Sequence, residues 1–354
     1  MTAVLSESAV SAAHPLSFRR LRADGDTAQP GRANATNGLL SQRWHLPQEG
    51  VDQAAPALLL PARPVGEAWW VTGEVRHFQR GCLSYSTNGQ WLYGTACIDD
   101  RREPGGLQAA ALRAYAELFE LLENSGCPHL LRLWNYVAGI NQPCDGLERY
   151  RHFNVGRQQA FLAARRPAFA GAPAACALGT EGGPLTVHFL AGQVPPQAIE
   201  NPRQVSAYHY PKEYGPRSPT FSRAAVAPLG GDREALFISG TASIVGHATL
   251  HLGDVRRQTI ETLDNIEAVL QAAAPHTRAV DAASGHRLDR LDYTVYVRDR
   301  ADLEAVRTAF EQRVGPASPA ARDAVYLRAD ICRADLLVEI EAQSVIDTGA
   351  GGRR

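Results

Sequence analysis

The chain has few of the features that most directly indicate a function. Lys212 is its one lysine, so a Schiff-base mechanism could use only that position. The 36 basic residues are balanced by 37 acidic ones, and a net charge of -1 gives no long-range attraction to nucleic acid or an anionic membrane. We therefore expect neither of these partners, and small-molecule chemistry is favoured.

The six cysteines form no CxxC pair, and the sequence has no uncharged apolar run of about 18 residues. Scattered cysteines in a chain of this size predict reduced thiols rather than a disulfide framework. The N-terminus lacks the basic start and continuous apolar core of a signal peptide. These observations predict a cytoplasmic protein.

The composition is that of a folded globular protein, with 45% hydrophobic and 21% charged residues. At roughly 150 residues per domain, 354 residues predict about two domains. We assign residues 1–50 to an irregular lead-in with a few short strands. Residues 51–225 are expected to form an N-terminal α+β domain, and residues 226–354 a C-terminal α+β domain.

Periodicity predicts the main elements of the first domain. Asn88-Gly89, a pair favoured in type I′ turns, predicts a hairpin, and a strand is expected to start at Ala68. Apolar residues at helical spacing predict a helix over 107–125, and a second helix is expected to begin near Asn154.

The second domain gives the element order β-β-α-β-α-β-β, with helices over 257–273 and 302–314 and a strand over HATLHLG. The first domain shows a looser version of the same order. The predicted fold class is therefore α+β, with two related halves, each a mixed β-sheet with helices packed on one face. Between the halves, the Pro-, Tyr- and Arg-rich segment 201–225 is expected to be a long, functional loop.

The second half carries a QT…L.NI…L pattern in its first helix and an R…V…L…VEIEA pattern at its end. The matching residues are Gln258, Thr259, Leu263, Asn265, Ile266, Leu270, Arg322, Val325, Leu327 and Val338 to Ala342. Both patterns resemble the RidA (YjgF-like) family. Most members are short single-domain chains, whereas this chain has more than 200 additional residues in front.

Four further segments are informative together: RYRHFNVGRQQAF (149–161), AYHYPKEYGPRSPTFSRA (207–224), SGTASIVGH (239–247) and ICRADLLVEIEA (331–342). In this order they resemble the chorismatases, which have a RidA-like fold and remove pyruvate from chorismate. The resemblance implies an enzyme acting on chorismate with no metal or organic cofactor. It also implies two RidA-like halves, and we favour a monomer over a RidA-like trimer because the halves could bury those surfaces internally.

Chorismate has two carboxylates, a ring hydroxyl and an enolpyruvyl ether, so its site needs cations, hydroxyl donors and one proton donor. Tyr150 and Arg157 could converge where a loop enters a helix, and a guanidinium matches a carboxylate well. In the 201–225 loop we expect Tyr210 and Arg223, and then Tyr208, to bind substrate. The alternatives are a solvated arginine face and a packing loop with surface tyrosines.

Backbone N–H groups near Gly240 are expected to bind a carboxylate, because no nucleophile elbow surrounds the neighbouring serine. Glu339 and Glu341 share one face of the last strand, where burial would raise a carboxyl pKa as a general acid requires. The resemblance assigns the catalytic role to Glu339. We expect Glu341 to be structural or exposed.

The resemblance also indicates a product. Members that form 3-hydroxybenzoate tend to carry a glycine in the strand after SGTAS and a cysteine seven residues before the catalytic glutamate, where hydrolytic members carry alanine. Gly246 and Cys332 match here, which predicts 3-hydroxybenzoate and pyruvate; Cys332 could instead be a small buried hydrophobe. The alternatives are hydrolysis to a dihydroxycyclohexadiene carboxylate, a RidA-like imine deaminase anchored on Arg322, or a non-catalytic ligand-binding subunit.

Overall fold

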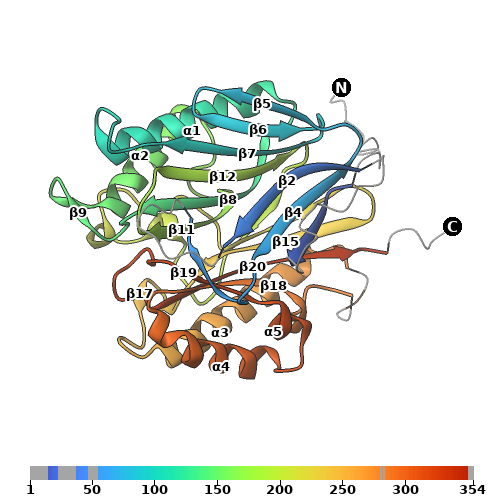
Figure 1. The fold of residues 1–354 in the computed structure, drawn as a ribbon, viewed down its shortest axis with the longest axis vertical. Coiled ribbons are helices and arrows are strands. Elements are labelled where there is room, and N and C mark those ends of the chain that lie inside the picture. Colours follow the sequence, from blue (N-terminus) through green and yellow to red (C-terminus); the bar gives the residue numbers. More distant parts are fainter. Residues whose placement is uncertain (1–14, 23–36, 47–54, 280, 282–283, 350–354) are drawn as a thin grey trace, which may run out of the picture.

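The computed structural model describes residues 15–22, 37–46, 55–279, 281 and 284–349. Two mixed β-sheets pack against each other at the centre, and helices cover their outer faces (Figure 1). The first sheet has the order β11-β8-β12-β7-β6-β5. Its strands are β5 (Arg76–Arg80), β6 (Leu83–Thr87), β7 (Trp91–Ile98), β8 (His129–Ala138), β11 (Ala174–Thr180) and β12 (Leu185–Gly192). Helices α1 (Gly106–Asn124) and α2 (Arg149–Ala163) cover it.

The second sheet has the order β3-β19-β18-β20-β15-β14-β13. Its strands are β3 (Ala57–Leu60), β13 (Gln197–Ile199), β14 (Ala224–Pro228), β15 (Arg233–Thr241), β18 (Asp292–Val297), β19 (Val325–Arg328) and β20 (Val338–Asp347). Helices α3 (Val255–Ala273), α4 (Leu303–Val314) and α5 (Pro319–Asp323) lie on the side of the molecule opposite α1 and α2 (Figure 1).

The two sheets repeat one topology. Apart from the added β3, strands β13, β14, β15, β18, β19 and β20 occupy the positions that β5, β6, β7, β8, β11 and β12 occupy in the first sheet. In each sheet one pair is parallel, β8 with β11 and β18 with β19. This correspondence confirms the predicted α+β fold of two related halves.

A third sheet of β1 (Ser17–Arg22), β4 (Val65–Thr72) and β2 (Asn37–His45) completes the centre. Buried side chains from all three sheets form one core, whereas α1 and α2, and α3 and α4, each enclose a separate outer core. Two strands of the third sheet come from the predicted lead-in. The domain boundary predicted at residue 225 falls inside β14.

Several predicted boundaries are wrong. Helix α2 begins at Arg149 rather than near Asn154, because Glu148 has extended backbone geometry and ends the preceding loop. The strand expected from Ala68 is two strands, β4 and β5. In HATLHLG only β17 (Ala248–Thr249) is a strand, paired with β16 (Ile244–Val245). None of the described helices is long and apolar enough to cross a membrane.

Candidate active site

A cavity of about 340 Å³ opens where the start of α2, the 201–225 loop and the inner strands of the second sheet meet. A cavity of this size can hold a drug-sized ligand. Six residues predicted to form the site line it: Tyr150, Tyr210, Arg223, Gly240, Cys332 and Glu339. They come from α2, the 201–225 loop, β15, the loop before β20 and β20 itself, so the fold joins residues that lie 189 positions apart, from Tyr150 to Glu339.

Glu339 is the carboxyl group in this cavity that is placed to act as an acid. The residue is 3% exposed and lies on the inner face of β20. Burial raises the pKa of Glu339 to about 8, and the nearby charge of Glu341 acts in the same direction, whereas Arg132 and Arg298 oppose the rise. A carboxyl group with this pKa holds its proton at neutral pH and can deliver it to a substrate.

Glu341 has a different environment, although it lies on the same face two residues further on. It forms an ion pair with Arg132 and accepts a hydrogen bond of 2.9 Å from the hydroxyl of Tyr296. Both partners are buried between the two sheets. Glu341 is therefore a structural carboxylate, as one of the two predicted alternatives had it, and it is not exposed.

Two arginines supply positive charge beside a pair of tyrosine rings. Arg223 Nη2 donates to the hydroxyl of Tyr210 at 2.8 Å and to the carbonyl oxygen of Val205. Arg333 lies 5.0 Å from the ring centroid of Tyr210 and 3.9 Å from that of Tyr214. Cations held against aromatic faces keep their charge while their remaining N–H groups stay available to an anion.

Arg333 is the main residue that the sequence prediction missed. Its Nη1 donates to the carbonyl oxygen of His247 at 2.8 Å, but its buried Nη2 has no hydrogen-bond partner among the described residues. Tyr214, also missed, lines the same wall. The available signal was the position of Arg333, directly after Cys332 in a segment already assigned to the site.

The remaining predicted residues in the cavity stand close to Glu339. A side chain on Gly240 would collide with the Glu339 carboxyl group, so only glycine leaves room for this acid. Burial raises the pKa of Tyr150, which holds its hydroxyl proton as a hydrogen-bond donor. Burial and the neighbouring Glu339 raise the pKa of the Cys332 thiol to about 12, so this cysteine is a neutral wall residue.

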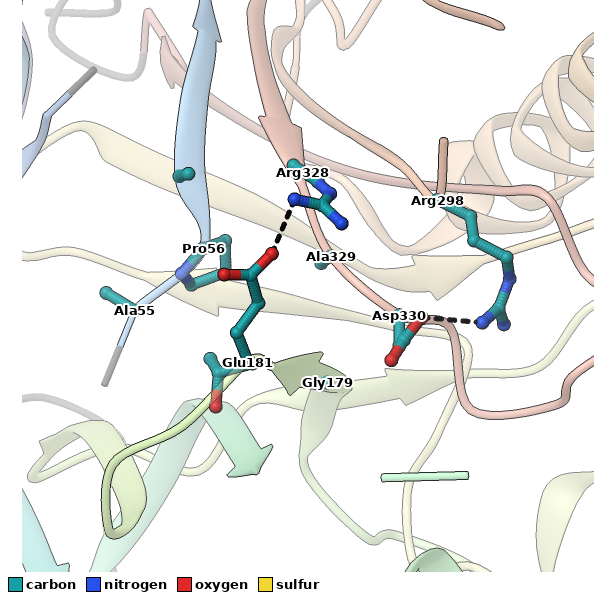
Figure 2. Close-up of a pocket in the computed structure, with 10 residues that line it drawn as sticks. Ala55, Pro56, Gly179, Glu181, Arg298, Arg328, Ala329 and Asp330 are labelled. Carbon is teal, nitrogen blue, oxygen red and sulfur yellow. Dashed lines mark hydrogen bonds and ion pairs between the residues drawn. The ribbon is translucent and has the colours of Figure 1, made fainter. Parts of the chain in front are cut away.

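A smaller cavity of about 50 Å³ lies on the other side of the loop that carries Cys332 and Arg333. Figure 2 shows two ion pairs beside it, Arg328 with Glu181 and Arg298 with Asp330. Arg298 also donates to the backbone carbonyls of residues 331, 333 and 336. Arg298 thus holds in place the loop that carries Cys332 and Arg333.

The structure places Arg157, predicted to bind a carboxylate, outside the cavity lining. Arg157 is 2% exposed and lies outside the residues that line the cavity. Its guanidinium packs within 6 Å of the ring centroids of Tyr115, Phe153 and Phe161 and donates to the carbonyl oxygen of Thr220. An arginine on the inward face of α2 can satisfy itself in this way, so Arg157 fastens the 201–225 loop to the helix.

Two further predicted residues lie outside the cavity lining. Tyr208 lies in the 3-10 turn Ala207–His209 and packs against Phe169. Gly246 lies in the turn between β16 and β17, with φ of 59°, and no described atom lies within 4 Å of where its side chain would be. It forms an isolated β-bridge with Gln204 instead of standing within the expected strand, and the glycine that lines the cavity is Gly240.

Within the described part of the chain, no group of three or more His, Cys, Asp or Glu side chains is arranged to hold a metal ion. The lining carries one protonated carboxyl group, several phenol hydroxyls and three arginines, of which Arg151 is paired with Glu148. This set is suited to binding an organic polyanion and transferring one proton to it.

Comparisons with known proteins give the same family. Residues 67–191 match the family model described as chorismatase FkbO/Hyg5-like, N-terminal. The chain is 39% identical over 307 residues to a 3-hydroxybenzoate synthase of Streptomyces hygroscopicus, covering 83% of this chain and 84% of that protein. It is 42% identical over 280 residues to a chorismatase of the same organism, covering 76% and 78% of the two chains.

A solved structure agrees over nearly the whole length. The crystal structure of a chorismatase at 1.08 Å resolution has a TM-score of 0.79 and 34% sequence identity, and the match covers 94% of this chain and 99% of that one. Fold and cavity define a two-half α+β enzyme with a buried carboxyl acid. The chain belongs to the chorismatase family.

Proposed function

We propose that the protein cleaves the enolpyruvyl ether of chorismate and releases pyruvate and 3-hydroxybenzoate. The observation that carries this proposal is the raised pKa of Glu339, about 8, in a cavity that also holds Arg223 and Arg333. An acid that keeps its proton at neutral pH beside two cations matches a dicarboxylate substrate that must be protonated to react.

The roles follow from position. Glu339 donates its proton to the methylene carbon of the enolpyruvyl group, and the positive charge that develops beside the ether oxygen weakens the bond to the ring. Arg223 and Arg333 hold the two carboxylates, and the hydroxyls of Tyr150 and Tyr210 bind oxygens of the substrate. Gly240 leaves the space in which the Glu339 carboxyl group stands. The Glu339 carboxylate then takes back the proton that the ring loses as it becomes aromatic.

The product depends on which nucleophile reacts. Water that attacks the charged carbon of the enolpyruvyl group gives a hemiketal, which releases pyruvate and the dihydroxycyclohexadiene carboxylate. Cys332 lines the cavity with a neutral thiol, and a bulky, weakly polar group at this position excludes water from the reacting atoms. The oxygen of the neighbouring ring hydroxyl then bonds to the ring carbon that bears the ether, while the ring–ether bond breaks and its electron pair completes pyruvate. The three-membered ring so formed opens at its other C–O bond, and loss of the ring proton gives 3-hydroxybenzoate without consuming water. One relative that is 39% identical bears the name 3-hydroxybenzoate synthase.

Incubation of the purified protein with chorismate and chromatography of the reaction test this proposal. We expect 3-hydroxybenzoate and pyruvate in equal amounts. A dihydroxycyclohexadiene carboxylate as the main product would contradict the product and retain the family chemistry. Release of ammonia from imines without turnover of chorismate would favour a RidA-like deaminase. Binding of chorismate without turnover would favour a ligand-binding subunit.

The repeated halves also support a monomer as the working assembly. The inner faces of both sheets and the third sheet are joined in one buried core, which includes Trp69, Trp134 and Phe237. Surfaces that a single-domain relative would bury against other subunits are occupied within this chain. Light scattering should give a molar mass near 38.3 kDa, and a mass three times larger would contradict the monomer.

A further inference from the structure

Glu200, an acid that the proposed mechanism does not use, has buried carboxyl oxygens and stands behind Arg223, one of the arginines of the cavity. It directly follows β13, which pairs antiparallel with β14 so that Ile199 lies opposite Ala224. The next position in this register sets Glu200 opposite Arg223. Directly opposed side chains lie on the same face, with Cβ atoms about 4.5–5.5 Å apart, so these two side chains are neighbours.

The contacts of the pair are incomplete. Both carboxyl oxygens of Glu200 are buried and have no hydrogen bond of good geometry among the described residues, and Nε of Arg223 likewise has no partner there. Burial raises the pKa of Glu200, whereas the nearby side chain of Ser206, the positive charge of Arg223 and the side chain of Ser222 oppose that rise. Glu200 lies outside the cavity lining, whereas Arg223 is part of it. The acid can thus act on a ligand only through its charge and through Arg223.

We infer that Glu200 is the resident counter-ion of Arg223 and limits the affinity of this end of the cavity for carboxylates. The inference rests on the proposed function, because substrate and both products are carboxylates. A carboxylate on the outer side of the guanidinium is attracted by Arg223 and repelled by Glu200. Weaker binding of anions favours release of two acidic products, a step that limits turnover in many enzymes.

A purely structural ion pair predicts the opposite result. If Glu200 only held Arg223 in place, its removal would loosen the guanidinium and weaken binding of every ligand that contacts it. If Glu200 is a counter-ion, its removal leaves Arg223 in place, since Val205 and Tyr210 still accept from it, and binding of anions becomes tighter. Binding of a neutral ligand of the same shape should then stay unchanged.

Glu200→Gln retains the shape of the side chain and removes its charge. Calorimetric titration should give a Kd for 3-hydroxybenzoate about three- to tenfold lower than in the wild type, the range expected for one like charge in a partly buried, salt-screened site. The Kd for 3-hydroxybenzamide, the neutral analogue, should not change. The KM for chorismate should fall with the Kd for the acid.

Glu261→Gln is the matched control, because Glu261 forms a 2.6 Å ion pair with Arg203 of the same loop, outside the cavity. It should change thermal stability and leave both affinities unaltered. An unchanged or higher Kd for 3-hydroxybenzoate in Glu200→Gln, or an equal change for the amide, would overturn the counter-ion role.

Binding is measured separately from turnover, so the two proposals can fail independently. Tighter binding of 3-hydroxybenzoate by Glu200→Gln without any turnover of chorismate by the wild type would contradict the proposed reaction and support the counter-ion. Turnover of chorismate by the wild type, with unchanged affinities in Glu200→Gln, would support the proposed reaction and contradict the counter-ion role.

Discussion

The two halves present equivalent strands to the centre of the molecule but carry different side chains there. In the first half Thr186 on β12 pairs with Tyr136 on β8; in the second, Glu339 on β20 pairs with Tyr296 on β18. The two tyrosine hydroxyls lie 3.5 Å apart, which marks them as counterparts. The position of Glu339, the proposed catalytic acid, is thus occupied by a threonine in the first half.

The next inward-facing position on each of these strands also carries a carboxyl group in the second half only. His188 of β12 corresponds to Glu341 of β20. Burial lowers the pKa of His188 to about 3, so the first half has a neutral imidazole where the second has an ion-paired carboxylate. At these two positions the repeated scaffold therefore carries carboxyl groups on β20 only, and the first half contributes to the cavity through the start of α2.

The largest effect should come from removing the acid. Glu339→Gln keeps the shape of the side chain but cannot transfer a proton, so kcat with chorismate should fall about 10²–10⁴-fold while the calorimetric affinity for chorismate survives. Thr186→Val, at the equivalent position of the first half, should leave kcat within about twofold. Near-normal turnover by Glu339→Gln, with Glu341→Gln inactive, would show that Glu341 and not Glu339 is the acid.

The same acid should reduce stability at high pH. An unfolded chain loses the Glu339 proton near pH 4.5, whereas the folded protein keeps it until about pH 8. Because the unfolded state binds fewer protons between these values, the free energy of unfolding should fall as the pH rises from about 4.5 to 8. Urea unfolding at pH 5 and pH 8 should show a smaller difference for Glu339→Gln than for the wild type, and an equal difference would contradict the buried neutral acid.

Substitutions of the arginines should distinguish those that bind substrate from the one that packs in the protein interior. Arg223→Lys and Arg333→Lys keep the charge but lose the planar fork, and the loss of one or two charged hydrogen bonds should lower kcat/KM about 10- to 100-fold, mainly through KM. Arg157→Lys should instead lower the melting temperature, because it removes packing against three rings, with kcat/KM changed less than about threefold. A large KM effect in Arg157→Lys alone would restore its predicted role.

These residues also show what sequence can and cannot predict. Alternation along the last strand predicts that Glu339 and Glu341 share a face, and both are buried on β20. The choice of Glu339 as the acid came from the family resemblance. The order of helices and strands likewise indicated the two related halves. Local periodicity carries this information, but the structure divided one expected strand into β4 and β5 and reduced another to the two residues of β17.

Arg157 and Arg333 could not be told apart in this way. Both are arginines in polar segments that match the family, and both pack against aromatic rings and a backbone carbonyl from distant segments. What separates them is that Arg333 lines the cavity and Arg157 does not. Arg157 meets Tyr115 of α1, whereas Arg333 meets two tyrosines of the 201–225 loop. Gly246 was misplaced because β16 and β17 have only two residues each, too few for alternation to predict a strand.

The charge of Glu341 should tune the acid beside it. This carboxylate raises the pKa of Glu339, so Glu341→Gln should lower that pKa below about 8. Because Glu339 acts in its protonated form, activity falls as the pH rises through its pKa, and the alkaline limb of the pH–kcat profile should move to lower pH in the variant. His188→Gln, at the equivalent position of the first half, is the control, and an unchanged limb in Glu341→Gln would show that burial alone sets the pKa.

The smallest expected change concerns the product. Cys332→Ala removes the thiol from the cavity wall and opens space for a water molecule near the reacting carbon, so a minor fraction of chorismate should be diverted to the dihydroxycyclohexadiene carboxylate. Gly246→Ala, predicted from sequence to act together with it, should leave the product ratio unchanged, because Gly246 lies in a hairpin turn outside the cavity lining.

Gly246→Ala should nevertheless cost stability, about 1 kcal/mol, because φ of 59° suits glycine and strains alanine. Chromatography of both reactions, at matched extents of conversion, separates the two residues. A shifted product ratio in Gly246→Ala would mean that the turn between β16 and β17 reaches the substrate. An unshifted ratio in Cys332→Ala would leave this cysteine as a small buried hydrophobe and assign the choice of product to the wall around Gly240.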